Sequence, residues 1–332
     1  FEKDCELKVF EFIRELEKLF STDNCNYLEL LNLFEIHINT IENLFDNENA
    51  IYMGAKRSPE NCSIGIFGVN YDGTCSFKPG ARFGPEAIRQ VSSCLETYCP
   101  KIKKDLEDIM YVDFGSILID KNDSKSVIES VKSATNYLIS KRLSPIMLGG
   151  EHSITRGAIE ALVKKYPDLI LVQLDAHADL RESYIGNEHS HACTMKRCLE
   201  VLPEKKILQV GIRSGTKEEF EIMHNNNQLV NFCPGGNAHE LKQALLPYAK
   251  SPIYLTIDLD WFDPSLLAGT GTPEPGGFFW NDFEEILKTL KNLRIVASDI
   301  VELSPEIDKS GVSSIVAAKV LRSLILSLEN MQ

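Results

Sequence analysis

Short apolar runs alternate with longer amphipathic segments from about residue 60 to the C-terminus. The apolar runs predict buried strands over 64–69, 109–113, 145–148, 169–174, 206–211, 253–257 and 295–297. The segments between them predict helices over 84–94, 124–140, 155–165, 217–224, 238–249, 280–290 and 312–328. Strands separated by helices of this length predict an α/β fold, with a mainly parallel central sheet covered by helices on both faces.

The first 60 residues have a different pattern. Apolar positions recur at helical spacing from Leu7 to Leu19 and again from Leu28 to Phe45, and no cluster of chemically reactive side chains accompanies them. We therefore predict that residues 1–60 form a helical N-terminal extension, packed on the main body or on a neighbouring subunit. Residues 61–332 contain no internal repeat or Pro/Ser-rich linker, so we predict a single catalytic domain there.

Composition narrows the classes of partner. The formal net charge of -13 disfavours binding to a nucleic-acid backbone and favours small cationic ligands. The nine cysteines include no C-x-x-C pair, which is typical of reduced thiols in a cytoplasmic protein. No apolar segment has the length of a membrane span, and the first residues lack the pattern of a secretion signal. We therefore expect a cytoplasmic protein without a nucleic-acid or membrane partner.

Acidic and imidazole side chains follow four of the predicted strands. The segments concerned are Gly149-Gly-Glu-His-Ser153, Asp175-Ala-His-Ala-Asp179, Asp258-Leu-Asp260 and Ser298-Asp-Ile-Val-Glu302. In open parallel sheets the ligand site lies beyond the carboxyl ends of the strands, so we expect these segments to meet there. Residues at i and i+2 point the same way if the chain stays extended, which would place the alternate Asp and His side chains on one face.

Six of these side chains make a candidate metal site: His152, Asp175, His177, Asp179, Asp258 and Asp260. Four carboxylates in a low-dielectric cleft repel one another strongly, and two divalent ions would neutralise them almost completely. The oxygen-rich, sulfur-free set favours Mn²⁺ over a structural zinc site, although the imidazoles leave Zn, Co, Ni and Fe open. We expect two Mn²⁺ per subunit.

These motifs, in this order, resemble those of the ureohydrolases, the arginase and agmatinase family. Ser190-His-Ala-Cys193 and Gly269-Thr-Gly-Thr-Pro-Glu-Pro-Gly-Gly277 belong to the same resemblance, as does Asp72-Gly-Thr74 upstream. The resemblance covers about residue 62 to the C-terminus. It implies an arginase-like three-layer α/β/α sandwich and hydrolysis of a guanidinium group to urea and an amine.

The resemblance also implies roles for the ligands. His152, Asp175, Asp179 and Asp258 would bind one ion, and Asp175, His177, Asp258 and Asp260 the other, with Asp175 and Asp258 as bridges. Two ions so placed would lower the pKa of a water molecule shared between them.

Three further roles follow from the same resemblance. Glu302 would pair with the guanidinium, a planar donor array that suits a carboxylate. His191 would shuttle protons or assist the leaving amine, and Asp179 would also orient the attacking water. Two alternatives stay open: His189 could exchange roles with His191, and Glu302 could instead pair with a buried arginine such as Arg213.

The loop at 180–190 resembles that of agmatinases rather than arginases, which implies agmatine as substrate, putrescine as product and a role in polyamine biosynthesis. The family also implies a homo-oligomer, a trimer or hexamer. Trp261, Phe262 and Ala268 depart from the family pattern beside the ligands, so we expect them to affect the width of the substrate pocket. Guanidinobutyrate, guanidinopropionate, arginine and guanidine remain alternative substrates, and a catalytically silent binding subunit on the same fold is a further alternative.

Overall fold

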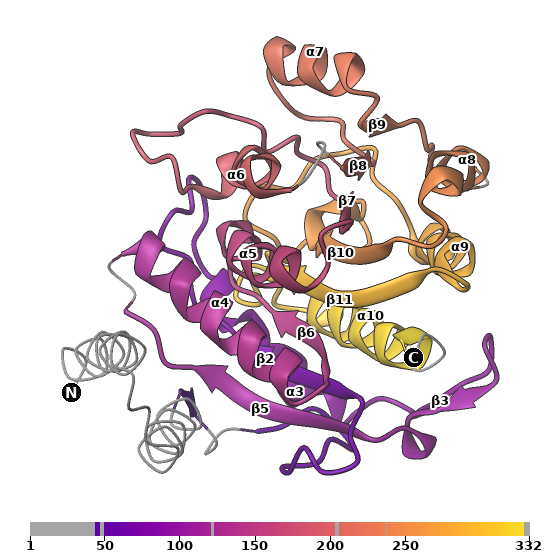
Figure 1. Cartoon of the computed structure of the whole chain (residues 1–332). Coiled ribbons are helices and arrows are strands. Elements are labelled where there is room, and N and C mark those ends of the chain that lie inside the picture. Colours follow the sequence, from indigo (N-terminus) through magenta and orange to yellow (C-terminus); the bar gives the residue numbers. More distant parts are fainter. Residues whose placement is uncertain (1–43, 47–49, 121–122, 203–205, 237, 329–332) are drawn as a thin grey trace, which may run out of the picture.

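The computed structural model describes residues 44–46, 50–120, 123–202, 206–236 and 238–328. Within these residues nine strands form one sheet in the order β1-β5-β2-β6-β11-β10-β7-β8-β9 (Figure 1). Every neighbouring pair is parallel except β1 and β5. The strands are β1 (Phe45–Asp46), β2 (Ile64–Gly68), β5 (Tyr111–Ile117), β6 (Ser144–Leu148), β7 (Ile170–Leu174), β8 (Ile207–Val210), β9 (Leu229–Val230), β10 (Pro252–Asp258) and β11 (Arg294–Val301).

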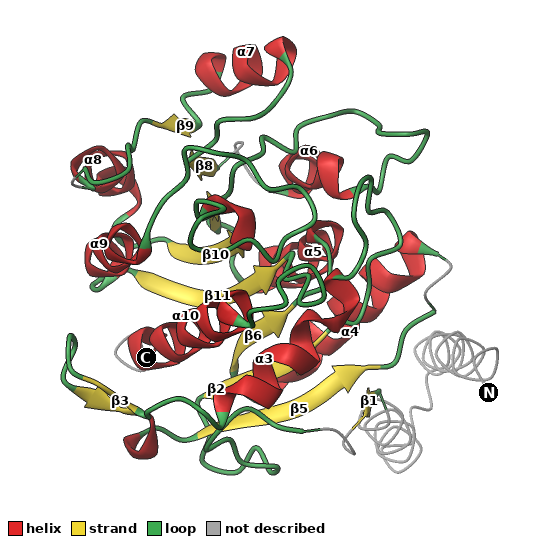
Figure 2. Ribbon diagram, turned by 180° about the vertical axis from the view of Figure 1, so that it is seen from behind, coloured by secondary structure: helices red, strands yellow, loops and turns green. Residues whose placement is uncertain are grey.

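Helices cover both faces of the sheet (Figure 2). One face carries α4 (Ser124–Ser140), α5 (Thr155–Lys165) and α6 (Thr194–Val201), and the other carries α3 (Gly84–Ser92), α8 (His239–Leu245), α9 (Trp280–Leu290) and α10 (Val312–Leu328). A further helix, α7 (Lys217–Asn225), follows β8, and β3 (Tyr98–Cys99) pairs with β4 (Lys104–Asp105) apart from the main sheet. The predicted three-layer α/β/α sandwich is confirmed.

Alternation along the strands explains why two separate cores form. Ile170 and Val172 of β7 face the core under α9 and α10, whereas Leu171 faces the core under α5 and α6. Because both faces of each central strand are buried, the strand reads as a continuous apolar run rather than an alternating one. This is the pattern from which the strands were predicted.

Strand β11 is longer than the sequence pattern predicts. The strand continues beyond the apolar run 295–297 through Ser298 and Asp299, which are both buried. Asp299 is tolerated there because three hydroxyl groups donate to it: Thr155 Oγ1 at 2.7 Å, Tyr254 Oη at 2.6 Å and Thr256 Oγ1 at 2.6 Å. The pattern also missed the short elements α6 and β9.

The predicted helices over 7–19 and most of 28–45 lie outside the described residues. At the end of the second range Phe45 is in strand β1 rather than in a helix, and its ring packs 5.1 Å from that of Phe114. Tyr52 is fully buried, and its hydroxyl donates to the Ala318 carbonyl at 2.8 Å. The packed body therefore extends upstream of residue 61, and a helical extension before residue 44 stays a prediction.

Among the described helices, none combines the length and the apolar composition needed to cross a membrane.

Candidate metal centre

The candidate site lies at the carboxyl ends of four adjacent central strands, β6, β11, β10 and β7. His152 begins a short 3-10 turn after β6, Asp175 follows β7, Asp258 is the last residue of β10, and Glu302 follows β11. Parallel neighbours end at the same edge of a sheet, so their following residues converge. The structure brings the six predicted ligands together at this edge.

The first group of ligands surrounds the imidazole of His152. Its Nδ1 lies 3.1 Å from Asp175 Oδ2, 3.2 Å from Asp179 Oδ2 and 3.4 Å from Asp258 Oδ2. All four side chains are buried. These are the four residues predicted to bind one ion.

The second group surrounds His177, whose Nδ1 lies 2.8 Å from Asp260 Oδ2 and 3.7 Å from Asp175 Oδ1. Asp175 thus faces His152 with Oδ2 and His177 with Oδ1. These oxygens also accept the Gln173 side-chain amide and the His177 N–H, both at 2.6 Å, so the role of Asp175 as a bridge remains a prediction. Ligand atoms of Asp175, His177 and Asp260 lie within 4.8 Å of one another. Asp258 faces His152 with Oδ2, while its Oδ1 accepts the Asp260 N–H at 2.9 Å. That Asp258 also binds the second ion therefore remains a prediction.

Hydrogen bonding around His152 shows that the site fits a cation. Its Nε2 lies 2.8 Å from Thr256 Oγ1, and the only hydrogen of that hydroxyl is donated to Asp299 at 2.6 Å. Thr256 must therefore accept from Nε2–H, which leaves Nδ1 to face the carboxylates of Asp175, Asp179 and Asp258. Burial opposes the charged form of this ring, but the three carboxylates outweigh it and raise the pKa of His152 well above its usual value. Carboxylates packed around one ring nitrogen in this way need a positive charge beside them, supplied by a proton on Nδ1 or by a bound cation.

The electrostatics of the cluster agree with this. Burial, followed by the charges of Asp260 and Asp179, raises the pKa of Asp175 to about 7. Burial also raises the pKa of Asp258 well above its usual value, with Asp260 and Asp175 adding to it. Burial opposes the charged form of His177, but the Asp260 carboxylate outweighs it and raises the pKa of that ring to about 11. These three groups are therefore shifted toward the state with less net negative charge, and bound divalent ions would relieve the same repulsion. Asp260 is the exception, because burial opposes its charged form but the charge of His177 outweighs burial and lowers its pKa to about 2.

The ligand segments are not extended, so the condition under which i and i+2 side chains would share a face is not met. Asp179 has a left-handed backbone with φ 53°, and Asp260 lies in the 3-10 turn Leu259–Trp261. The Ala176 N–H donates to Asp260 Oδ1 at 3.1 Å and ties the two segments together. The i, i+2 pattern identified residues that meet, but turns rather than an extended chain bring them together.

Arg213 fixes the segment that carries Asp260. Its guanidinium donates to the backbone carbonyls of Gly211, Asp260, Trp261, Glu274 and Pro275. The shortest of these bonds, at 2.7 Å, reaches the carbonyl of Asp260 itself. Glu302 is not among its partners in the described structure, so the alternative Glu302–Arg213 pair does not form.

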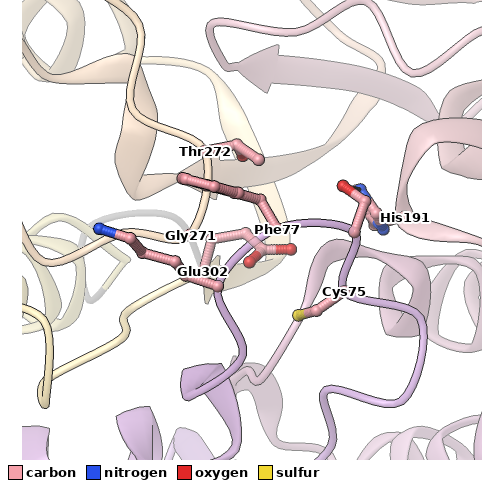
Figure 3. A pocket seen from close by; sticks show the side chains of 8 residues that line it. Cys75, Phe77, His191, Gly271, Thr272 and Glu302 are labelled. Atoms are coloured by element: carbon pink, nitrogen blue, oxygen red, sulfur yellow. Dashed lines mark hydrogen bonds between the residues drawn. The ribbon is translucent and has the colours of Figure 1, made fainter.

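Glu302 instead opens onto a small pocket beside the metal ligands. One carboxylate oxygen accepts the His152 N–H at 2.8 Å, and the backbone has a left-handed φ of 66°. Burial, then the charge of Glu151, raises the pKa of Glu302 well above its usual value. The pocket is lined by Cys75, Ser76, Phe77, Lys78, His191, Gly271, Thr272 and Glu302 (Figure 3).

His191 lines this pocket, and His189 is held elsewhere. The His191 ring lies 3.4 Å from Thr74 Oγ1 through Nδ1 and 3.4 Å from Ser76 Oγ through Nε2. His189 Nδ1 lies 3.3 Å from an Arg156 nitrogen on α5. Placement thus favours His191 as the residue that meets a substrate.

Two groups of residues singled out in the sequence do not line this pocket. Trp261 and Phe262 are fully buried, and the Trp261 ring stacks on Phe278 with centroids 4.3 Å apart, so neither borders the pocket. The loop 180–190 supplies none of the residues that line the pocket in the described structure. The wall comes instead from residues 75–78 and from Gly271 and Thr272. The motif Asp72-Gly-Thr74 marked that region, but it has no cluster of metal-binding or catalytic residue types from which a role could be predicted.

Comparisons with known proteins agree with this geometry. The model of the arginase family matches residues 62–327. An agmatinase of Bacillus cereus is 34% identical over 278 residues, 83% of this chain and 95% of that protein. The N(1)-aminopropylagmatine ureohydrolase of Thermococcus kodakarensis is 37% identical over 271 residues, 79% of this chain and 90% of that protein. The crystal structure of the agmatine ureohydrolase of Thermoplasma volcanium aligns with a TM-score of 0.73 and 34% identity, covering 88% of this chain and 97% of that one.

Proposed function

Because the chain belongs to the arginase family, we propose that it is an amidinohydrolase that cleaves agmatine to urea and putrescine. The observation that carries a metal-dependent hydrolysis is the placement of His152 Nδ1 within 3.4 Å of three carboxylates. The substrate follows from the relatives, several of which are named for agmatine or its aminopropyl derivative.

The proposed cofactor is a pair of Mn²⁺ ions held by the six residues His152, Asp175, His177, Asp179, Asp258 and Asp260. When bound, two divalent ions supply the positive charge that lowers the pKa of a water molecule and makes it nucleophilic at neutral pH. Asp179 would orient that water and accept its proton.

Glu302 and His191 would act on the substrate. One oxygen of Glu302 is fixed by the His152 N–H, which leaves the other oxygen for the guanidinium. His191 would donate a proton from Nε2 to the nitrogen that leaves as putrescine, because an amine leaves more readily when protonated. Both side chains line the same pocket, so one bound substrate can meet both.

One observation favours a second candidate substrate. Lys78 lines the pocket, and its ammonium lies 5.4 Å from the centre of the Phe77 ring. A cation at that position attracts the carboxylate of a guanidino acid and repels the terminal ammonium of agmatine. A guanidino acid such as guanidinobutyrate is therefore the second candidate substrate.

A substrate panel tests the proposal. The protein, loaded with Mn²⁺ or Ni²⁺, is assayed for urea with agmatine, N(1)-aminopropylagmatine, guanidinobutyrate, guanidinopropionate, arginine and guanidine. We expect the highest kcat/KM with agmatine. Turnover of guanidinobutyrate without turnover of agmatine would transfer the assignment to a guanidino-acid hydrolase. A protein that binds no metal by elemental analysis and releases no urea would support a silent binding subunit.

We also propose a cytoplasmic homo-oligomer, a trimer or hexamer, that serves polyamine biosynthesis. The described cysteines are all free thiols, which supports a reducing compartment. Light scattering coupled to size-exclusion chromatography would test the oligomeric state, and a monomer would contradict it.

A further inference from the structure

We propose that Glu151 is a positioning residue for His191 and acts through the hydroxyl group of Thr74. The inference rests on the proposed function, in which His191 transfers protons. It concerns a relay from the Glu151 carboxylate through the Thr74 hydroxyl to the His191 imidazole. The relay lies beside the metal site, and none of its three residues is a metal ligand.

Glu151 is fully buried and is held by donors from two segments. Its Oε1 accepts the hydroxyls of Thr74 at 2.7 Å and Ser153 at 2.8 Å, and its Oε2 accepts the Thr74 N–H at 2.9 Å. A buried carboxylate costs several kcal/mol unless such donors surround it, and two of its three come from Thr74. Thr74 is therefore fixed both through its backbone and through its side chain.

The direction of the hydrogen bonds then determines what Thr74 offers to His191. A hydroxyl group has one hydrogen, and that of Thr74 is donated to Glu151. Toward His191 it can only accept: it takes the backbone N–H at 3.1 Å, and Nδ1 lies 3.4 Å away. The hydroxyl of Ser190 lies 3.3 Å from the same Nδ1 and, unlike that of Thr74, can turn to accept or to donate. Thr74 thus suits a ring that carries a proton on Nδ1. The other nitrogen, Nε2, is then the one that exchanges a proton at the pocket.

The segment around Thr74 is closed, so this position is well defined. Asp72 accepts the Gly80 N–H at 2.8 Å and joins the two ends of the loop 72–80, whose residues 75–78 line the pocket. On its other side the His191 ring meets the edge of Tyr184, with ring centroids 5.9 Å apart. Through its two hydrogen bonds to Thr74, Glu151 orients the imidazole and anchors the loop that forms the pocket wall.

The test begins with the hydroxyl of Thr74. Thr74→Val keeps the shape and removes the hydroxyl, whereas Thr74→Ser keeps it. For urea release from agmatine by the Mn²⁺-loaded protein, we expect Thr74→Val to lower kcat roughly 100-fold with KM changed less than about threefold. Thr74→Ser should remain within about threefold of the parent in kcat. Thr135→Val is the matched control, because Thr135 on α4 is also buried but its hydroxyl has no hydrogen-bond partner in the described structure.

A double-mutant cycle asks whether Thr74 acts through His191. In a His191→Gln background, Thr74→Val should have little further effect on kcat, since residues that act as a unit are not additive. Glu151→Gln should give a loss similar to that of Thr74→Val, while elemental analysis still finds the parental metal content. A multiplicative loss in the double variant would overturn the proposal.

Crystal structures of the two Thr74 variants provide a readout that does not depend on turnover. The His191 ring should be displaced in Thr74→Val and in place in Thr74→Ser. An unmoved ring in Thr74→Val would refute the relay even if urea release fell. A parent protein that hydrolyses none of the guanidino compounds would refute the proposed function, and the ring position would still decide the relay.

Discussion

At the scale of single residues, His152 is constrained on both sides of its ring. Thr256 and Asp299 fix the proton on Nε2, and three carboxylates face Nδ1. A metal-binding histidine commonly donates its other N–H to such a partner, which sets its tautomer and orientation. The sequence predicts His152 as a ligand from its motif, but Thr256 carries no signal, because a threonine within an apolar strand is ordinary.

The first prediction concerns Asp258, which faces His152 at 3.4 Å. Asp258→Asn removes a negative charge from the ligand set at nearly unchanged volume. We expect urea release to fall at least about 100-fold, because loss of charge weakens binding of the ions that activate water. Elemental analysis should find less metal per chain than in the parent. Full activity with full metal content would contradict the assignment of Asp258 as a ligand.

The residue scale also shows where the sequence was insufficient. That the six candidate ligands and Glu302 meet at one edge of the sheet could be predicted, because charged residues after buried strands are difficult to explain by packing. Thr74 and Glu151 could not, since their role depends on a contact between residues 77 positions apart. Trp261 lies beside Asp260 in the sequence yet points into the aromatic core, because the direction of a side chain in a turn cannot be read from its neighbours.

At the scale of elements, four adjacent strands place the residues of the candidate site, and the turns after them are fixed by side chains. Helices α4, α5, α9 and α10 have the bounds predicted from apolar periodicity, because their caps and apolar faces are local properties. Strand β11 is longer than the apolar run predicts, because its buried Asp299 accepts hydrogen bonds from hydroxyl groups of other elements, which the local sequence does not reveal.

The second prediction concerns Arg213, which joins the turn after β10 to the loop at 274–275. Lysine offers three donors without the rigid fork of arginine, so it cannot reproduce the five bonds to backbone carbonyls. We expect Arg213→Lys to weaken metal binding roughly 10–100-fold by loosening Asp260. Metal titration with a fluorescent competitor would measure this change. Arg294→Lys, at the opposite end of β11, is the control and should bind metal like the parent.

The third prediction concerns strand β1. The Phe45 ring packs 5.1 Å from Phe114, 5.8 Å from Tyr137 and 6.5 Å from Phe67, and pairing with β5 orders its backbone. We expect Phe45→Ala to lower the free energy of unfolding by about 3 kcal/mol, the cost of emptying a buried aromatic site. Chemical denaturation monitored by fluorescence would measure it.

The matched control for Phe45→Ala is Phe77→Ala, because Phe77 is 68% exposed. Removing an exposed ring should change the free energy of unfolding by less than about 0.5 kcal/mol. Equal losses in the two variants would show that β1 does not pack on the domain as described.

At the scale of the whole molecule, two apolar cores enclose a sheet whose centre carries a concentrated group of charges. Desolvated carboxylates of this kind destabilise a fold unless protons or cations neutralise them. The cores can be predicted from the sequence because each central strand is apolar on both faces. The strand order cannot, since it depends on which of many parallel pairings buries the most surface.

The fourth prediction follows from that balance and concerns metal removal. Without metal, the pKa of Asp175 is raised to about 7 by burial and neighbouring carboxylates, and that of His177 to about 11 by Asp260. A group whose folded pKa is raised stabilises the fold below its unfolded pKa, and this contribution is lost as pH rises to the folded value. For Asp175 the loss spans about pH 4 to 7, and for His177 it continues above about 6.5. The protein stripped of metal by a chelator should therefore lose stability as the pH rises from about 5.5 to 7.5.

Metal binding has the opposite pH dependence, because ligands must be deprotonated and binding releases their protons. At a hundredfold excess of free Mn²⁺ over its Kd, the ion adds ~2.7 kcal/mol per site, and Kd falls as pH rises. Calorimetric scans of chelated and Mn²⁺-loaded protein should therefore show a difference in Tm that widens from about pH 5.5 to 7.5. In Asp258→Asn, which has one carboxylate fewer, the difference should be smaller at every pH. A difference that stays constant or narrows as pH rises would mean that these carboxylates are not the groups that bind the ions.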